Sequence, residues 1–94
     1  MFPGRQAARR AFEGDLGAAA NRFFRGATSK SRNFRATALE GGGHSLQYFS
    51  PARNAGYGKR YVQDVSSNGQ VLREFKETLG PNGLIETKWV HGGP

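Results

Sequence analysis

The sequence predicts an α+β domain in which one or two N-terminal helices pack on an antiparallel sheet of about four strands. Apolar residues recur every three or four positions over residues 5–25, which is the spacing of one face of a helix. From Phe34 onward this period gives way to short alternating runs separated by turn residues, a pattern typical of strands. A layer of helix on one antiparallel sheet is a standard way to bury the apolar side of both.

The helical pattern has a weak point in its middle. Gly14 and Gly17 each cost about 1 kcal/mol relative to Ala in a helix interior. The sequence is therefore compatible with one long helix and equally with two short helices that are separated near residues 13–15. In the second case Asp15 would be the N-cap of the second helix. The apolar stripe consists of Ala8, Phe12, Leu16, Ala19 and Phe23. Residues 25–33, RGATSKSRN, have no period and are expected to form a loop.

Five runs after the loop have strand character, and the last three are the clearest. Residues 34–40 and 44–50 alternate on either side of a triple glycine, and residues 51–58 are expected to form a loop. Residues 59–65, 70–79 and 84–90 are joined by SSNG and GPNG, which both end in Asn-Gly, the strongest short hairpin signal. An antiparallel meander is therefore predicted for the C-terminal part.

Alternation assigns side chains to the two faces of these strands, since every second residue points the same way. On this basis one apolar set is expected to meet the N-terminal helix: Val71, Phe75, Leu79, Ile85 and Trp89. A polar set is expected on the open face of the sheet: Lys76, Thr78, Glu86 and Lys88.

Length and composition indicate one domain, residues 1–94, with a basic lead-in over residues 1–33 and a sheet body over residues 34–94. The 94 residues contain no cysteine, so neither disulfides nor a thiolate metal site supplements a thin core. No apolar run approaches the ~20 residues of a membrane helix, so no membrane span is expected.

The net charge of +7 is unevenly distributed. Residues 1–39 carry eight basic and two acidic side chains, whereas residues 40–94 carry six basic and five acidic ones. Charge of this size and asymmetry favours a polyanionic partner, either a nucleic acid, an acidic membrane surface or an acidic protein. The alternative is a basicity that serves solubility alone.

Several kinds of chemistry lack the residues that they need. His44 and His91 are the only histidines, and no carboxylate stands at a ligand spacing from either, so no metal site and no cofactor are expected. The GGGHS stretch lacks the Lys-Ser/Thr ending of a phosphate-binding loop. What remains is a basic and aromatic surface with two histidines and a few carboxylates. Such a surface could serve metal-independent RNA cleavage, which needs a proton acceptor, a proton donor and cations near the phosphate.

The candidate catalytic residues are His44, His91, Glu86, Thr87 and Lys88. The two imidazoles suit proton transfer near neutral pH, and His44 follows three glycines, which would admit a ribose closely. Candidates for holding substrate are Lys59, Arg60, Tyr57 and Lys76, where the cations contact phosphate and Tyr57 stacks on a base. These residues also have non-functional explanations. The histidines could simply face water, Glu86 could form a solvated pair with Lys76, and the strand aromatics could belong to the core.

A resemblance to a known group rests on three stretches within residues 34–94, namely GGGH, GYGKRYVQ and IETKWVHGG. The region resembles the barnase–EndoU–colicin–RelE ribonucleases and the C-terminal toxin domains of bacterial polymorphic toxins. The resemblance implies a metal-independent endoribonuclease that attacks tRNA or other RNA and is blocked by a cognate acidic immunity protein. It also implies secretion or delivery as part of a larger toxin that acts in the target-cell cytoplasm. The group uses different catalytic residues on one scaffold, so it implies no fixed triad.

Two other functions stay open on the sequence. A non-catalytic nucleic-acid-binding module would share the charge signal but would need neither histidine. A protein-interaction domain would dock its basic helix on an acidic partner. The nuclease hypothesis requires that at least one imidazole shares a cleft with Lys59, Arg60 and Lys88.

Overall fold

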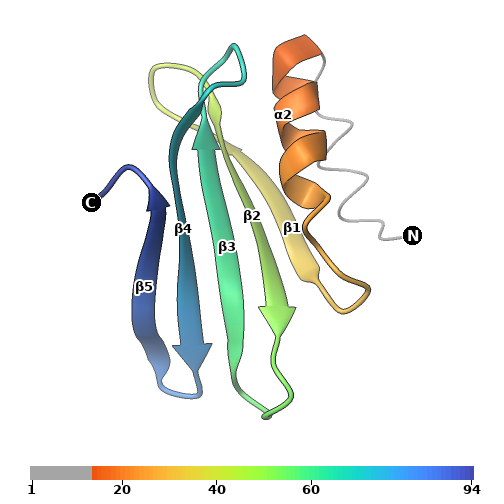
Figure 1. Ribbon diagram of the computed structural model, residues 1–94, viewed down its shortest axis with the longest axis vertical. Helices are drawn as coiled ribbons and strands as arrows, with labels where there is room; N and C mark the ends of the chain where they lie inside the picture. The colour runs from red at the N-terminus through yellow and green to blue at the C-terminus, as the bar shows by residue number, and fades with distance from the viewer. Residues whose placement is uncertain (1–13) are drawn as a thin grey trace.

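The computed structural model describes residues 14–94 and has one helix and five antiparallel strands (Figure 1). The strands follow one another across the sheet in the order of the chain, so the whole sheet is a meander. The α+β class is confirmed, with five strands where about four were expected. The first half of the expected helical region lies outside the described residues. The elements are α2 (Gly14–Phe24), β1 (Arg32–Ala38), β2 (His44–Pro51), β3 (Gly58–Val65), β4 (Val71–Gly80) and β5 (Gly83–His91).

Helix α2 presents a short apolar stripe to one side of the sheet. Asp15 lies in its first turn and Arg22 in its last, and both charges complement the helix dipole. The buried residues recur at the helical spacing, so they share one side of the helix and contact β2 and β3. They are Ala19, Ala20, Phe23 and Phe24.

The core lies between α2 and the N-terminal half of the sheet. Leu46 and Val65 are fully buried beneath the helix, and Tyr48 is 5% exposed. The rings of Phe23 and Tyr48 lie 5.2 Å apart between centroids, and those of Tyr48 and Tyr61 5.0 Å apart. Figure 1 shows β5 at the sheet edge farthest from α2. The helix therefore stabilises the first strands of the sheet and leaves the last two largely to their own cross-strand pairs.

Both expected Asn-Gly hairpins are confirmed. Gly69 and Gly83 have φ values of 86° and 109°, which the hairpin turns require and which glycine adopts without steric cost. At the first turn, the Ser66 amide donates to the Gln70 carbonyl at 2.8 Å. The triple glycine forms the β1–β2 turn. A Cβ on Gly43 would lie 2.2 Å from the Val65 carbonyl oxygen, so only glycine fits there.

The assignment of strand faces was wrong for most of the apolar set. We call the side covered by α2 the helix face and the other side the open face. The register aligns Leu46, a core residue, with Gln63 and Glu74. The next residue of β4, Phe75, must therefore point to the open face, together with its partner Trp89 at 4.7 Å between ring centroids.

Leu79 follows Phe75 on the open face, and Ile85 is 60% exposed, so neither meets the helix. Val71 does pack against the core, because a register shift between Asp64 and Val65 breaks the alternation in β4. The register also places Lys76 and Lys88 in line with Tyr48 and Tyr61. By the same alternation, the expected polar set of Lys76, Thr78, Glu86 and Lys88 lies on the helix face, not the open face.

Candidate functional site

The open face carries two arginine–carboxylate pairs between neighbouring strands. Arg60 Nε donates to Glu77 Oε1 at 2.6 Å, and Arg73 Nε donates to Asp64 Oδ2 at 2.6 Å. Each pair joins residues that face each other directly across β3 and β4. The Arg60–Glu77 pair is partly exposed and contributes about 0.2–1 kcal/mol, so its position matters more here than its contribution to stability.

A pocket of about 310 Å³ opens beside the Arg60–Glu77 pair, and we call it the arginine pocket. Arg35 reaches it from β1 and Arg60 from β3, while Gln47 and Phe49 reach it from the strand between them. The register explains this convergence, since Arg35 faces Gln47 and Phe49 faces Arg60 across adjacent strands. Two guanidinium groups and an amide thus gather around an aromatic ring, which is a set of donors suited to a phosphate.

An irregularity of β1 helps to shape the arginine pocket. The register shifts between Arg32 and Arg35, and Asn33 within the shift has a φ of 59°. Asn is one of the few non-glycine residues that tolerate this conformation, and bulges re-aim side chains at sheet edges. The shift brings Asn33 to the lining of the pocket beside Arg35.

The Glu77 carboxylate is held on one side only. Both contacts from Arg60, through Nε and through Nη2, go to the same oxygen, Oε1. The Glu77 side chain is 14% exposed, whereas that of Arg60 is 45% exposed. Arg60 therefore fixes the carboxylate and keeps part of its guanidinium open to solvent, and Oε2 of Glu77 takes no part in the contact with Arg60.

Asp64 is the most deeply buried ionisable side chain in the described part of the chain. It is 4% exposed, and its Oδ1 is buried with no hydrogen-bond partner among residues 14–94. Its other oxygen accepts from Arg73, whose side chain is 49% exposed. A buried carboxylate oxygen without a donor is costly, so the Arg73 contact is needed to keep this residue within the sheet.

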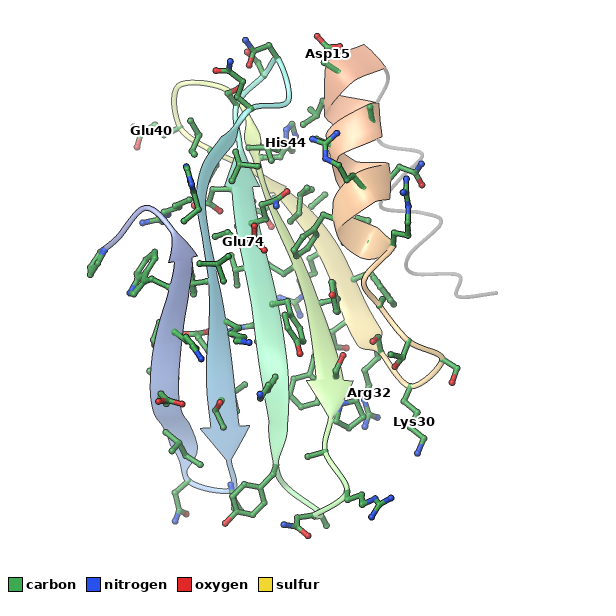
Figure 2. The ribbon with its side chains drawn as sticks, viewed as in Figure 1. Asp15, Lys30, Arg32, Glu40, His44 and Glu74 are labelled. Atoms are coloured by element: carbon green, nitrogen blue, oxygen red, sulfur yellow. The ribbon has the colours of Figure 1, made fainter. Side chains whose placement is uncertain are left out.

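The structure does not bring the two histidines together. His44 is the first residue of β2 on the helix face, while His91 ends β5 opposite Glu74. Three strand spacings separate β2 from β5, or about 14 Å. His44 also lies five residues from Phe49, about 17 Å along an extended strand, and Figure 2 shows it at the opposite end of the sheet from Arg32. Neither histidine lines the arginine pocket.

The other sequence-predicted residues divide between the two faces. Lys59 and Arg60 are neighbours in β3, so they point in opposite directions, with Lys59 on the helix face. Alternation likewise separates Thr87, aligned with Glu77 and Arg60 on the open face, from its neighbours Glu86 and Lys88. Lys76 lies opposite Lys88 on the helix face, and Tyr57 is 41% exposed in the β2–β3 loop. Only Arg60 of this set lines the arginine pocket.

Sequence reasoning missed four residues of this region: Asn33, Arg35, Gln47 and Glu77. A signal for the Arg60–Glu77 pair was present. If cross-strand positions are counted outward from the Asn68–Gly69 turn, Asp64 falls opposite Arg73 and Arg60 falls opposite Glu77. This is the register of the structure. Arg35 had no such signal, because the β1 bulge shifts its alignment with β2.

Comparisons with known proteins give no relatives: no family model matches the chain, and neither a curated protein nor a solved structure matches it. No helix among residues 14–94 has the length and hydrophobicity needed to cross a membrane. The same residues contain no group of histidine and carboxylate side chains that would hold a metal ion.

Proposed function

We propose that this protein is a metal-independent endoribonuclease whose site is the arginine pocket of the open face. The observation that supports it is the convergence of Arg35 and Arg60 on one pocket with the Glu77 carboxylate fixed beside it. Cations and a positioned proton acceptor are the groups that attack by a ribose 2′-OH requires. The net charge of +7 would attract RNA to this surface.

In the proposed reaction, a backbone phosphate lies against the guanidinium groups of Arg35 and Arg60. Glu77 Oε2 takes the proton of the 2′-OH, and the 2′ oxygen forms a bond to phosphorus. The bond from phosphorus to the 5′ oxygen breaks, and this oxygen takes a proton from solvent. The products are a 2′,3′-cyclic phosphate and a 5′-hydroxyl. The arginines stabilise the additional negative charge on the phosphate oxygens as it develops.

The form of the hypothesis that the sequence suggested, in which at least one imidazole shares a cleft with Lys59, Arg60 and Lys88, does not fit the arginine pocket, because Arg60 lines it without either histidine or either lysine. The present proposal replaces the imidazoles with the Glu77 carboxylate. His44 and His91 lie too far apart to share two proton transfers on one phosphate, and neither lines the pocket. We therefore expect that His44→Ala leaves cleavage largely intact. Lys59, Lys76 and Lys88 would contact RNA only as it passes over the helix face.

The resemblance to polymorphic toxin domains extends the proposal to the biological setting. The chain would be delivered as part of a larger secreted toxin and would act on RNA, tRNA in particular, in the cytoplasm of the target cell. A cognate acidic immunity protein would block the arginine pocket. The basic character of the chain supports an acidic inhibitor, because complementary charge speeds association.

Incubation of the protein with tRNA in EDTA tests the proposal directly. We expect cyclic-phosphate products from the natural sequence and a loss of at least 100-fold in rate for Glu77→Gln, which keeps the shape but cannot accept the proton. Arg35→Ala should slow cleavage, whereas Arg22→Ala, on the exposed side of α2, should not. Cleavage that Glu77→Gln leaves unchanged would exclude this mechanism.

A second candidate is RNA binding without cleavage. The observation that favours it is the Arg60–Glu77 contact itself, since cross-strand ion pairs also serve sheet stability alone. This function predicts salt-sensitive binding at the arginine pocket with no product from any RNA, including tRNA.

A further inference from the structure

A second pocket, of about 420 Å³, lies next to the arginine pocket, and we call it the loop pocket. It is formed by the N-terminal end of β1, the C-terminal end of β2 and the β2–β3 loop. Its volume lies within the range of small-ligand sites, roughly 300–1,000 Å³. Its lining combines apolar surface with a guanidinium, an amide and a phenol, and it includes Arg32, Phe49, Pro51, Ala52, Asn54 and Tyr57.

Phe49 lines both pockets, so its ring lies between them. The ring is held there because the residue beside it, Gly58, has no side chain: a Cβ at this position would lie 2.3 Å from Phe49 Cζ. Gly58 thus admits the ring close to the backbone of β3. Whatever fills one pocket contacts the ring that borders the other.

Phe49 and Tyr57 differ from the other aromatic side chains of residues 14–94. The rest pair with another ring, in the core around Tyr48 or in the Phe75–Trp89 contact. Phe49 and Tyr57 have no ring partner within the described part of the chain, and both line the loop pocket. Phe49 packs against Gly58 and Tyr57 lies near Gly80, and no other described ring competes for the parts of the two rings that line the loop pocket. These parts can contact a flat ligand.

The backbone of the loop is ordered by its own hydrogen bonds. The Ala52 amide donates to the Tyr57 carbonyl at 2.9 Å, and the Tyr57 amide donates to the Asn54 carbonyl at 3.1 Å. These bonds fix the main chain that carries Tyr57 and Asn54. A pocket formed in advance loses less entropy on binding than a mobile loop does.

We infer that the loop pocket binds one unpaired nucleobase of the strand whose phosphate occupies the arginine pocket. Phe49 and Tyr57 offer faces for stacking, and Arg32 and Asn54 offer donors and acceptors for the base edge. A base within a duplex is stacked on both sides and paired along its edge, so it cannot enter. The substrate class is therefore single-stranded RNA or an RNA loop. This inference rests on the proposed function, since it assigns a substrate to the same site.

Binding of short 2′-O-methyl RNA tests the inference separately from cleavage, because these strands have no 2′-OH to attack. Fluorescence anisotropy would compare a labelled uridine hexamer, an abasic hexamer with the same backbone, and the uridine hexamer paired with its complement. We expect the abasic and duplex forms to bind on the order of ten-fold more weakly, the size of effect that one stacked base gives.

Variants that belong to only one pocket separate the two proposals. Tyr57→Leu, at a partly exposed loop position, should weaken binding of the uridine hexamer and leave the abasic hexamer unchanged. Asn54→Ala serves as a second variant of the loop pocket. Arg35→Ala should weaken binding of both hexamers equally, because the proposal assigns the Arg35 side chain to the phosphate, which both hexamers have.

The outcomes have distinct meanings. Equal affinity for the uridine and abasic hexamers, or for the single strand and the duplex, would overturn the base pocket and leave the arginine pocket standing. An Arg35→Ala protein that binds every strand as the natural sequence does would overturn the proposed function instead. Circular dichroism of each variant confirms that the fold is retained.

Discussion

Replacing Gly58 by alanine should disturb the partition between the two pockets. An added Cβ would lie 2.3 Å from Phe49 Cζ, 2.7 Å from Phe49 Cε1 and 2.9 Å from the Ser50 carbonyl oxygen. Ordinary contacts of a Cβ begin near 3.4 Å, so the ring must move by about 1 Å. The carbonyl belongs to the backbone of β2 and cannot turn away as a side chain does.

The expected cost follows from these contacts. Overpacking of this kind costs typically 1–3 kcal/mol. Replacing glycine by alanine also lowers the entropy of the unfolded chain, which stabilises the protein by about 0.4–1 kcal/mol. We therefore expect Gly58→Ala to lower the free energy of unfolding by about 1–2 kcal/mol. In a Phe49→Ala background only the carbonyl contact remains, so the cost should fall below about 1 kcal/mol.

Urea unfolding followed by the fluorescence of Trp89, the single tryptophan, measures the four proteins of this double-mutant cycle. Gly93→Ala is the matched control, since a Cβ there meets nothing within 4 Å. If Gly58→Ala lowers the free energy of unfolding equally with and without the Phe49 ring, the ring does not depend on the absence of a side chain at Gly58. No cost at all would refute the packing itself.

Three other substitutions probe separate features. Gly43→Ala should destabilise the protein by several kcal/mol more than Gly41→Ala in thermal unfolding, because both glycines have positive φ but only Gly43 faces a backbone carbonyl at 2.2 Å; equal melting temperatures would contradict this. Asp64→Ala should cost about 1–3 kcal/mol in urea unfolding, as it removes a hydrogen bond to a charged group at a 4% exposed position; a change under 0.5 kcal/mol would show that the pair is dispensable. Arg35→Ala should reduce the slope of log K for RNA binding against log salt by about 1, while Arg22→Ala, away from the pocket, should leave it unchanged.

The secondary structure was largely readable from the sequence, and each success has a local cause. The stripe that ends in Ala19 and Phe23 repeats at the helical period, and these residues form the buried side of α2. The two Asn-Gly turns need positive φ at glycine, and a hairpin forms at each Asn-Gly dipeptide. Local backbone preferences act within a few residues, so a single sequence carries them.

The face that α2 covers was decided only by the tertiary structure. Alternation shows that Phe75 and Trp89 share a side, but both sides of β4 and β5 carry apolar residues, so local pattern cannot say which side meets a helix from the other end of the chain. Bulges add to the ambiguity, since the shift after Asp64 moves Val71 to the helix face.

The candidate site shows the same division. Sequence alone determined a basic chain and a meander of hairpins, and it held an unused signal for the register that pairs Arg60 with Glu77. Only the folded sheet showed that Arg35 lines the same pocket as Arg60 and that the two histidines stay apart, because such arrangements depend on strand order, bulges and the covered face together. These are properties of the assembled sheet, and no stretch of the chain contains them.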